Sequence, residues 1–372
     1  MKKLFTITLF YLLTFTAIGQ NINVIKKPEM LRKQFRKEIR IPDIPGYLTL
    51  KCDFHMHTIF SDGDVWPTVR VQEAYYEGLD AIALTDHIEG QPRKKYVDGN
   101  QNSAYEIAKS EADKFNILLV KAGEITRGMP PGHLNALFLE DVTKLDTPNY
   151  MEAIKEANKQ GAFVFWNHPG WQAQQPDTNK WWDVHEDIYQ KGWLHGVEVY
   201  NWDEYYPIAF DWCNEKHLAF MCNSDIHIIN SQRFDLINYR RPLTLVFAED
   251  KSLVALKEAL FEKRTVAFFA DEMAGPEDLL SKLFQASIKI GKPFKVVGEK
   301  HYIEISNPTD LTFILENKNP ENNSPEKIEL YPGSSVIVNY KSENGMVELA
   351  YEVLNLHIGS DKNLHTVLTI SD

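Results

Sequence analysis

Between residues 47 and 275 the chain alternates between short apolar segments and amphipathic segments, and this alternation limits the folds open to it. The amphipathic segments have helical spacing. Two of them end close to Gly78 and Gly161, and glycine commonly follows the last residue of a helix. Repeated strand–helix units indicate a parallel α/β barrel or a doubly wound sheet. The expected helices are 69–77, 105–115, 150–159, 208–216 and 253–263, and the expected strands are 47–50, 81–84, 117–120, 162–165, 196–200, 218–222, 243–247 and 266–269.

After residue 275 the pattern changes to short strands separated by turn formers such as Pro332-Gly333. Strands spaced about 8–12 residues apart are typical of a small all-β sandwich. We therefore predict a lead segment over 20–46, an α/β domain over 47–275 and an all-β domain over 276–372. The strands expected in the last domain are 301–305, 311–316, 328–331, 335–340, 347–354 and 364–370.

The overall composition excludes several classes of protein. The 372 residues carry a formal charge of −12, which repels polyanions and argues against a long nucleic acid as partner. A hydrophobic fraction of 44% and a charged fraction of 25% are ordinary globular values, so the chain is neither disordered nor a coiled coil. Cys52, Cys213 and Cys222 are too few for a disulfide framework and are expected to be buried free thiols.

The first residues have the pattern of a targeting segment. Lys2 and Lys3 precede an uncharged apolar run over 4–18, and Gly19 then meets polar sequence. This pattern predicts a cleaved secretory signal over 1–19. The alternative, a membrane anchor, would need a run of about 20 residues. We expect a secreted or periplasmic protein with no membrane span after cleavage.

The 12 histidines are placed unevenly, and one pair shares a strand face. His55 and His57 continue the first expected strand, and residues two apart on a strand point to the same side. Two converging imidazoles are a metal-binding arrangement, although a surface strand can carry such a pair by chance. Asp62 follows in a loop and adds a carboxylate nearby.

The later strands repeat this placement, because histidine or carboxylate residues follow almost every one. In parallel α/β folds the chemistry lies at the carboxyl ends of the strands, so these side chains should converge and bind metal. The residues at these strand ends are His87, Glu124, His133, His168, Asp225 and His227. The other histidines lie away from strand ends and are expected on the surface or in packing: His185, His195, His217, His301, His357 and His365.

Together these motifs resemble those of the polymerase and histidinol phosphatase (PHP) family of metal-dependent phosphoesterases. The resemblance runs from about residue 50 to 230 and keeps the family's order. It implies a distorted barrel of seven β/α units with a trinuclear metal cluster in its mouth. The matching motifs are His55-x-His57, Ser61-Asp62-Gly63, Thr85-Asp86-His87, Glu124, Gly132-His133, Asn167-His168-Pro169 and Asp225-x-His227.

The resemblance also implies a role for each ligand. It assigns His55, His57, Glu124 and Asp225 to a first metal, Asp62, His87 and His227 to a second, and Glu124, His133 and His168 to a third. Glu124, Asp225 and His168 would then surround a metal-bridging hydroxide that acts as nucleophile. We expect two to three divalent ions, and mixed nitrogen and oxygen ligands leave Zn, Mn and Fe open.

Some nearby residues have two interpretations. Arg127 either clamps a phosphate oxygen or is a solvated loop residue, and the same choice holds for Arg233 and for Arg93-Lys94-Lys95. Asp86 is expected to orient a loop rather than bind metal. The tryptophans of the 170–205 stretch either grip a substrate group or pack an insertion. They are Trp171, Trp181, Trp182, Trp193 and Trp202.

Three function classes follow. The leading one is an exported phosphodiesterase that acts on small phosphate diesters, with a phosphomonoesterase for nucleotides or sugar phosphates as the alternative in the same family. The second is a metal-dependent hydrolase of carboxyl esters or amides. The third is a non-catalytic binding module that acts through its β domain.

Overall fold

The computed structural model describes residues 24–31, 35–319, 323–342 and 347–370. The chain divides into two units, 1–35 and 36–372. The described part of the first unit contains one short 3-10 helix, η1 (Pro28–Met30). The predicted signal segment over 1–19 lies outside the described residues. The second unit carries both the α/β part and the β part of the fold.

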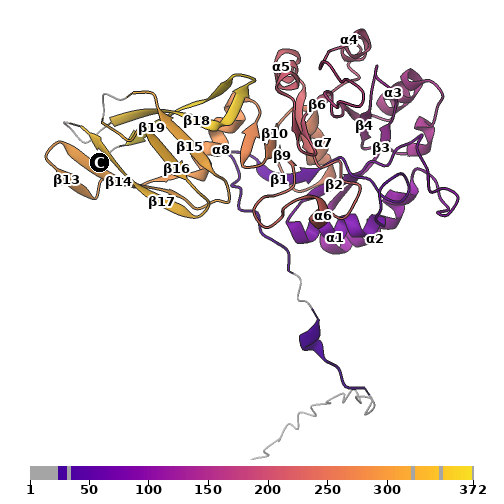
Figure 1. Cartoon of the computed structure of the whole chain (residues 1–372), viewed down its shortest axis with the longest axis horizontal. Coiled ribbons are helices and arrows are strands. Elements are labelled where there is room, and N and C mark those ends of the chain that lie inside the picture. Colours follow the sequence, from indigo (N-terminus) through magenta and orange to yellow (C-terminus); the bar gives the residue numbers. More distant parts are fainter. Residues whose placement is uncertain (1–23, 32–34, 320–322, 343–346, 371–372) are drawn as a thin grey trace, which may run out of the picture. The chain divides into compact units, whose positions relative to one another are not determined.

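The α/β part consists of strands surrounded by helices, as the alternating pattern predicts (Figure 1). Its strands are β1 (Leu48–Asp53), β2 (Ala81–Leu84), β3 (Leu118–Ile125), β4 (Leu134–Leu137), β5 (Phe163–Trp166), β6 (Gly196–Asn201), β7 (Glu204–Tyr205), β8 (Ala219–Asn223), β9 (Leu243–Ala248) and β10 (Thr265–Phe269). Its helices are α1 (Pro67–Glu77), α2 (Ser103–Phe115), η2 (Val142–Leu145), α3 (Tyr150–Lys159), α4 (Asp183–Gln190), α5 (Pro207–Lys216), α6 (Asn230–Arg233) and α7 (Leu253–Phe261).

Local sequence explains where these helices begin and end. Pro67 starts α1, where its missing N–H costs nothing, and Gly78 ends it in the left-handed conformation at φ 92°. At the start of α3, the side chain of Asn149 accepts a hydrogen bond from the backbone N–H of Met151. These start and stop residues hold the β/α units to short connections.

Strand pairing gives a mixed barrel rather than a purely parallel one. Strands β1, β2 and β3 are parallel neighbours, and so are β5, β6 and β8. Between these groups β4 runs antiparallel to both β3 and β5. On the other side β9 runs antiparallel to β1 and to β10. This arrangement is the distorted α/β barrel that the resemblance implies.

Two threonine hydroxyls join β8 to the strands that complete the barrel. The backbone N–H of Cys222 donates to Thr244 Oγ1 on β9 at 2.9 Å. The backbone N–H of Phe220 donates to Thr265 Oγ1 on β10, also at 2.9 Å. Side-chain hydroxyls thus satisfy buried backbone donors where β8 faces β9 and β10.

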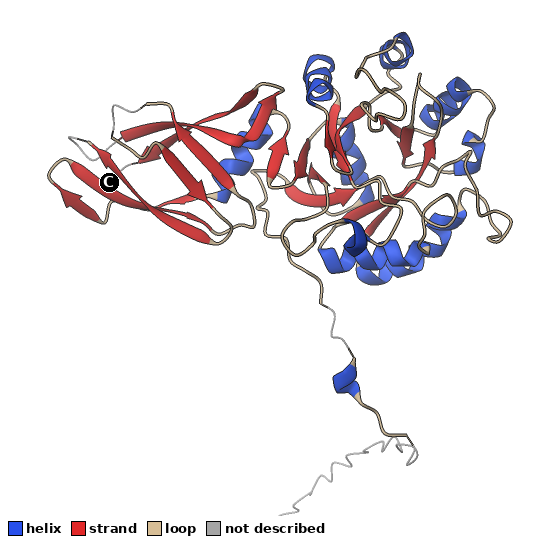
Figure 2. Ribbon diagram, in the orientation of Figure 1, coloured by secondary structure: helices blue, strands red, loops and turns tan. Residues whose placement is uncertain are grey.

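The β part continues directly from the barrel sheet. Strand β11 (Glu272–Ala274) pairs with β10 on one side and runs parallel to β18 (Val347–Gly359) on the other. Figure 2 shows that strands dominate the chain after helix α8 (Glu277–Ser287). They are β12 (Lys289–Ile290), β13 (Lys295–Val297), β14 (Lys300–Asn307), β15 (Phe313–Asn317), β16 (Lys327–Leu330), β17 (Ser334–Lys341), β18 (Val347–Gly359) and β19 (Lys362–Ile370).

One helix in the predicted all-β region was missed from the sequence. Helix α8 (Glu277–Ser287) follows Pro276 and buries Leu280, Leu283 and Phe284. Those side chains belong to one continuous core that includes residues of both the barrel and the β part. The helix therefore packs against β10 of the barrel and against β18 and β19 of the β part.

Part of the predicted lead segment belongs to the second unit. Ile39, Ile41 and Ile44, from this segment, are buried in the core.

The three cysteines are buried free thiols, as expected. Within the described residues, none of the helices has the length and apolar character needed to cross a membrane.

Candidate metal centre

His55 and His57 follow the end of β1 in extended chain that pairs with the residues after β8. The backbone N–H of His57 donates to Ile226 at 3.0 Å, and that of Asp225 donates to the His55 carbonyl at 2.9 Å. Both imidazoles are fully buried, with ring centroids 5.2 Å apart. The spacing of two residues therefore turns both rings to one side, as the sequence predicts.

The other predicted ligands reach the same place from different strands. His87 follows β2, His168 follows β5, and Asp225 and His227 follow β8. Glu124 differs from expectation because it lies inside β3 rather than beyond its end. Strand β3 is longer than predicted, since residues 122–125 pair with β4 and stay extended.

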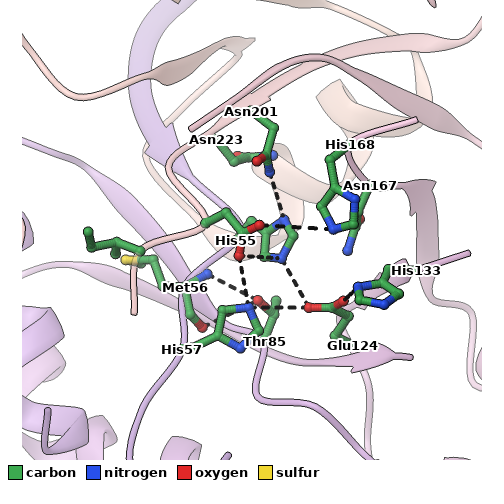
Figure 3. Close-up of polar contacts among 12 residues, drawn as sticks. His55, Met56, His57, Thr85, Glu124, His133, Asn167, His168, Asn201 and Asn223 are labelled. Carbon is green, nitrogen blue, oxygen red and sulfur yellow. Dashed lines mark hydrogen bonds and ion pairs between the residues drawn. The ribbon is translucent and has the colours of Figure 1, made fainter. Parts of the chain in front are cut away.

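Glu124 lies at the centre of the cluster and is fully buried (Figure 3). Its Oε2 atom is 3.0 Å from His55 Nε2 and 3.2 Å from His57 Nε2. Its Oε1 atom is 2.6 Å from His133 Nδ1. One carboxylate therefore faces three imidazoles from two different segments of chain.

Asp225 and Asp62 occupy the flanks of this cluster. Asp225 Oδ1 lies 3.1 Å from both His55 Nε2 and His57 Nε2. Asp62 Oδ1 lies 3.2 Å from His227 Nε2, and its Oδ2 lies 3.4 Å from His87 Nε2. Each of the three carboxylates therefore lies beside a different set of histidines.

All nine predicted ligands fall into groups whose donor atoms lie within 4.8 Å of one another. Mixed imidazole and carboxylate donors are the set that first-row divalent metals take. The groups are His57, Asp62, His87 and His227; His55, Glu124 and His168; His55, His57 and Asp225; and His87, Glu124 and His133.

Unsatisfied buried atoms show that these residues fit metal ions. Among the described residues, the buried atoms without a hydrogen-bond partner include His57 Nε2, Glu124 Oε1, His133 Nδ1 and Asp225 Oδ1. Glu124 Oε1 and His133 Nδ1 are close together but are not aligned for a hydrogen bond. Because buried polar atoms are costly without a partner, this crowding suits shared cations.

The electrostatics of the cluster also favour positive charge. Burial opposes protonation of His55, but Asp225, Glu198 and Glu124 outweigh it and raise its pKa well above the usual value. Burial likewise works against ionisation of Glu124, yet the surrounding histidines hold its pKa well below the ordinary range. His168 behaves differently, since burial lowers its pKa to about 3 and leaves it a neutral donor.

Two cluster residues have a backbone conformation that is rare outside glycine. His168 has φ 28° and Asp225 has φ 50°. Each is held by a backbone hydrogen bond, from His168 N to Glu198 Oε2 at 2.7 Å and from Asp225 N to the His55 carbonyl at 2.9 Å. Such strain persists where surrounding contacts enforce it, and it is concentrated at functional sites.

Glu198 is a member of the site that the sequence analysis missed. It is fully buried on β6, and its Oε1 lies 3.0 Å from His55 Nδ1. Its Oε2 accepts the N–H of His168 and an amide hydrogen of Asn201 at 2.8 Å. A proton on His55 Nδ1 directed at Glu198 leaves Nε2 to face Glu124 and Asp225. A lone carboxylate between Val197 and Val199 was the available signal.

Asp86 orients a loop, in line with its expected role. Its Oδ1 accepts hydrogen bonds from the N–H of Thr58 and the hydroxyl of Ser61, both at 2.7 Å. Its Oδ2 accepts the Thr58 hydroxyl at 2.7 Å. These contacts hold the loop that carries Asp62.

The three arginines singled out in the sequence, Arg93, Arg127 and Arg233, each pair with a carboxylate of the protein. Arg127 pairs with Glu89 and donates to the Thr147 carbonyl at 2.7 Å. It is not among the residues that line the cavity over the cluster, and its phosphate-clamp role stays a prediction. Arg233 lies 4.2 Å from the ring centroid of Trp202 and pairs with Asp203 at 2.9 Å.

A cavity of about 370 Å³ opens over the cluster. Trp171 and Trp202 line it, whereas Trp181 packs edge-to-face against Trp166 and Trp212. The tryptophan-rich stretch therefore contributes to both the cavity and the packed interior, and its contact with a substrate group stays a prediction. Most of the cavity lining consists of the candidate ligands Asp62, His87, Glu124, His133, His168, Asp225 and His227.

A distorted α/β barrel whose mouth holds nine clustered histidine and carboxylate side chains defines a metal-dependent hydrolase. A solved two-domain protein from Bacteroides vulgatus ATCC 8482, described as containing a predicted PHP-like metal-dependent phosphoesterase, is 43% identical to this chain. The match covers 91% of this chain and 100% of that one, with a TM-score of 0.87. The chain therefore belongs to the PHP-like metal-dependent phosphoesterases.

Other comparisons cover less of the chain. A family model described as DUF5001, an Ig-like domain, matches residues 288–369. An uncharacterized protein of Methanocaldococcus jannaschii is 34% identical over 84 residues, which are 22% of this chain and 36% of that protein. The chain thus spans about a third of that curated relative. An amidohydrolase structure from Chromobacterium violaceum is 13% identical, covering 48% of this chain and 88% of that one at a TM-score of 0.37.

Proposed function

We propose that the protein is an exported phosphodiesterase that hydrolyses small phosphate diesters at a three-metal site in the barrel mouth. The observation that carries this proposal is the convergence of the nine donor residues on one buried cluster beneath an open cavity. Four overlapping groups of donors, each containing a carboxylate, support a site for several neighbouring ions. Export is supported by the signal pattern over 1–19.

The roles of the ligands follow from their contacts. Glu124 is placed to bridge ions, because its two oxygens face different histidines. Asp225 joins the His55–His57 pair, and Asp62 joins His87 to His227. Divalent cations bound here would activate water and neutralise the phosphoryl oxygens.

The chain's own residues prepare the site for this chemistry. Glu198 fixes His55 and the backbone of His168, so two ligands from different strands share one support. Asp86 holds the loop that carries Asp62. In the reaction, the oxygen of water bonds to phosphorus, the phosphorus–oxygen bond to the alcohol breaks, and the alcohol leaves with a proton.

Two measurements test the proposal. Protein purified without added metal is expected to hold two to three divalent ions per chain, and fewer than two would contradict the site as drawn. The protein should hydrolyse bis(p-nitrophenyl) phosphate faster than p-nitrophenyl phosphate and p-nitrophenyl acetate. Activity on the acetate alone would favour the carboxyl-ester hydrolase, and preference for the monoester would favour the phosphomonoesterase.

Paired histidine variants give the control. His55→Ala should abolish diester hydrolysis, because it removes a buried member of the cluster. His365→Ala, at an exposed histidine of the β part, should leave it unchanged. Full activity in His55→Ala would support a binding module with an unrelated contaminating activity. Export is tested by sequencing the N-terminus of the cell-derived protein, which should begin at Gln20.

A further inference from the structure

The part of the cavity that contains no candidate ligand forms a distinct wall. We call its residues the cavity wall: Trp171, Asn201, Trp202, Asp203 and Glu204. Four of them are consecutive and form the end of β6, the turn and the start of β7. Trp171 lies just beyond β5. A substrate group that projects from the ligand cluster must meet these side chains.

The two indoles of the cavity wall are not equivalent. The ring of Trp171 lies 5.8 Å from the His133 ring and 5.3 Å from the His168 ring, and 40% of the residue is exposed. Trp202 lies on the other side, 6.4 Å from the His227 ring, and Arg233 covers one of its faces. Trp171 therefore offers the freer aromatic surface beside the cluster.

The polar groups of the wall are mainly acceptors. Asp203 is neutralised by Arg233, whereas Glu204 accepts a hydrogen bond from the Tyr206 hydroxyl at 2.5 Å and has no such cation beside it in the described wall. Among the described residues that line the cavity, none is lysine or arginine. A second anionic group on the substrate would thus meet carboxylates rather than cations, while a hydroxyl could donate to Glu204.

Cavity size limits the group further. At about 370 Å³ the cavity lies near the small end of the ~300–1,000 Å³ typical of ligand sites. A phosphate with one ring system fits such a volume better than a phosphate with two large groups. Stacking on an indole favours a flat or flat-faced ring.

Building on the proposed function, we propose that the substrate is a phosphate diester whose retained organic group is an uncharged, hydroxylated ring. That ring packs on Trp171 and donates a hydroxyl hydrogen bond to Glu204. Sugars, cyclitols and nucleosides share this chemistry. Trp171 and Glu204 are then specificity-determining residues of the site.

A series of p-nitrophenyl phosphate diesters tests the proposal with one readout, the release of p-nitrophenolate. The second ester group is methyl, choline, ribos-5-yl, thymidin-5′-yl, or thymidin-5′-yl with a 3′-phosphate. The ribosyl or thymidinyl ester should exceed the methyl ester in kcat/KM by about tenfold or more, given the usual strength of ring stacking. The ester with the added phosphate should fall below its parent, and the ribosyl–thymidinyl ratio distinguishes sugar from base.

Variants assign the preference to the wall. Trp171→Ala should reduce the ring-to-methyl ratio of kcat/KM to near one, mainly through KM, and Trp171→Phe should restore part of it. Glu204→Gln should reduce the penalty on the 3′-phosphate ester. The matched control Tyr96→Ala removes an aromatic residue that is 82% exposed and outside the cavity, and it should keep the wild-type ratio.

The outcomes separate this inference from the proposed function. Equal rates for methyl and ring esters, or preference for the choline or 3′-phosphate ester, would overturn the ring proposal while leaving the diesterase intact. Failure to hydrolyse any diester, bis(p-nitrophenyl) phosphate included, would overturn the proposed function itself. Calorimetric binding of ribose 5-phosphate to the metal-loaded protein, weakened in Trp171→Ala, provides a readout independent of turnover.

Discussion

Two buried carboxylates on β1 and β3, Asp53 and Glu124, have opposite surroundings although both are fully buried. Asp53 Oδ2 pairs with Arg241 at 2.9 Å and accepts the Ser224 hydroxyl at 2.5 Å. Glu124 is surrounded by histidine rings, and one of its oxygens has no hydrogen-bond partner among the described residues. Both oxygens of Asp53 have partners within the protein, whereas the crowded Glu124 carboxylate suits a bound cation.

This comparison separates what holds the barrel together from what gives it chemistry. Asp53 also accepts the N–H of Ser224 at 3.2 Å, so it ties β1 to the segment after β8. That tie lies directly beneath the residues that carry His55 and Asp225. The Asp53 carboxylate therefore supports the backbone on which the His55 and Asp225 cluster is built.

The largest expected effect is on activity at Glu124. Glu124→Gln keeps the shape of the side chain but removes the charge that faces three histidines, so kcat/KM for bis(p-nitrophenyl) phosphate should fall by on the order of 10³-fold. Its thermal unfolding in chelator should change less than that of Asp53→Asn. Near wild-type turnover would show that the cluster does not need this carboxylate.

A large loss of stability is expected at Asp53. Asp53→Asn removes one of the two carboxylates paired with the buried Arg241 and leaves Glu77 at 2.8 Å, so it should cost about 3 kcal/mol of unfolding free energy. Urea denaturation of metal-free protein measures this loss. Asp113→Asn, which breaks the exposed pair with Lys109, serves as the comparison and should cost far less. Equal losses of unfolding free energy in Asp53→Asn and Asp113→Asn would mean that the Asp53 contacts stabilise the fold no more than an exposed ion pair does.

His185 is a third buried ionisable group, and its contribution to stability should depend on pH. Its Nε2 lies 2.7 Å from the Pro131 carbonyl, its ring stacks on Trp166, and burial lowers its pKa to about 4. Folding therefore favours the neutral form of His185. The contribution of this residue to the unfolding free energy is complete above about pH 6.5 and is lost as the pH falls towards 4.

The difference in unfolding free energy between wild type and His185→Gln isolates this contribution. It should shrink by up to about 3 kcal/mol between pH 7 and pH 4. His365→Gln, at an exposed histidine, serves as the comparison variant. If the difference in unfolding free energy is constant with pH, burial does not lower the pKa of His185 in the folded protein.

The smallest effect is expected at Glu198, which contacts the ring nitrogen of His55 that does not face Glu124 and Asp225. Glu198→Gln keeps a hydrogen-bonding group beside His55 but removes its charge, and should weaken metal binding about 10- to 100-fold. Competition with a chromophoric chelator measures this affinity directly. Glu249→Gln, at an exposed carboxylate, is the matched control. Unchanged affinity in Glu198→Gln would make its role purely structural.

Much of the site could be predicted because short-range geometry places it. The His55–His57 spacing turns both rings to one face of extended chain, and strand ends collect at one edge of a barrel. Glu198 was missed because a single carboxylate in an apolar strand has no local partner that reveals its purpose. Helix α8 was missed because the strand pattern after residue 290 dominated the interpretation of the segment before it.

By itself the sequence determined the α/β barrel, the all-β end of the chain and the nine residues that converge, since periodicity and strand-end placement are local properties. Only the tertiary structure decided which atoms meet. It placed Glu124 between several imidazoles, gave Asp53 an arginine partner from β9's side of the barrel, and divided the tryptophans between cavity and core. Those outcomes depend on contacts between residues far apart in sequence, which no local pattern encodes.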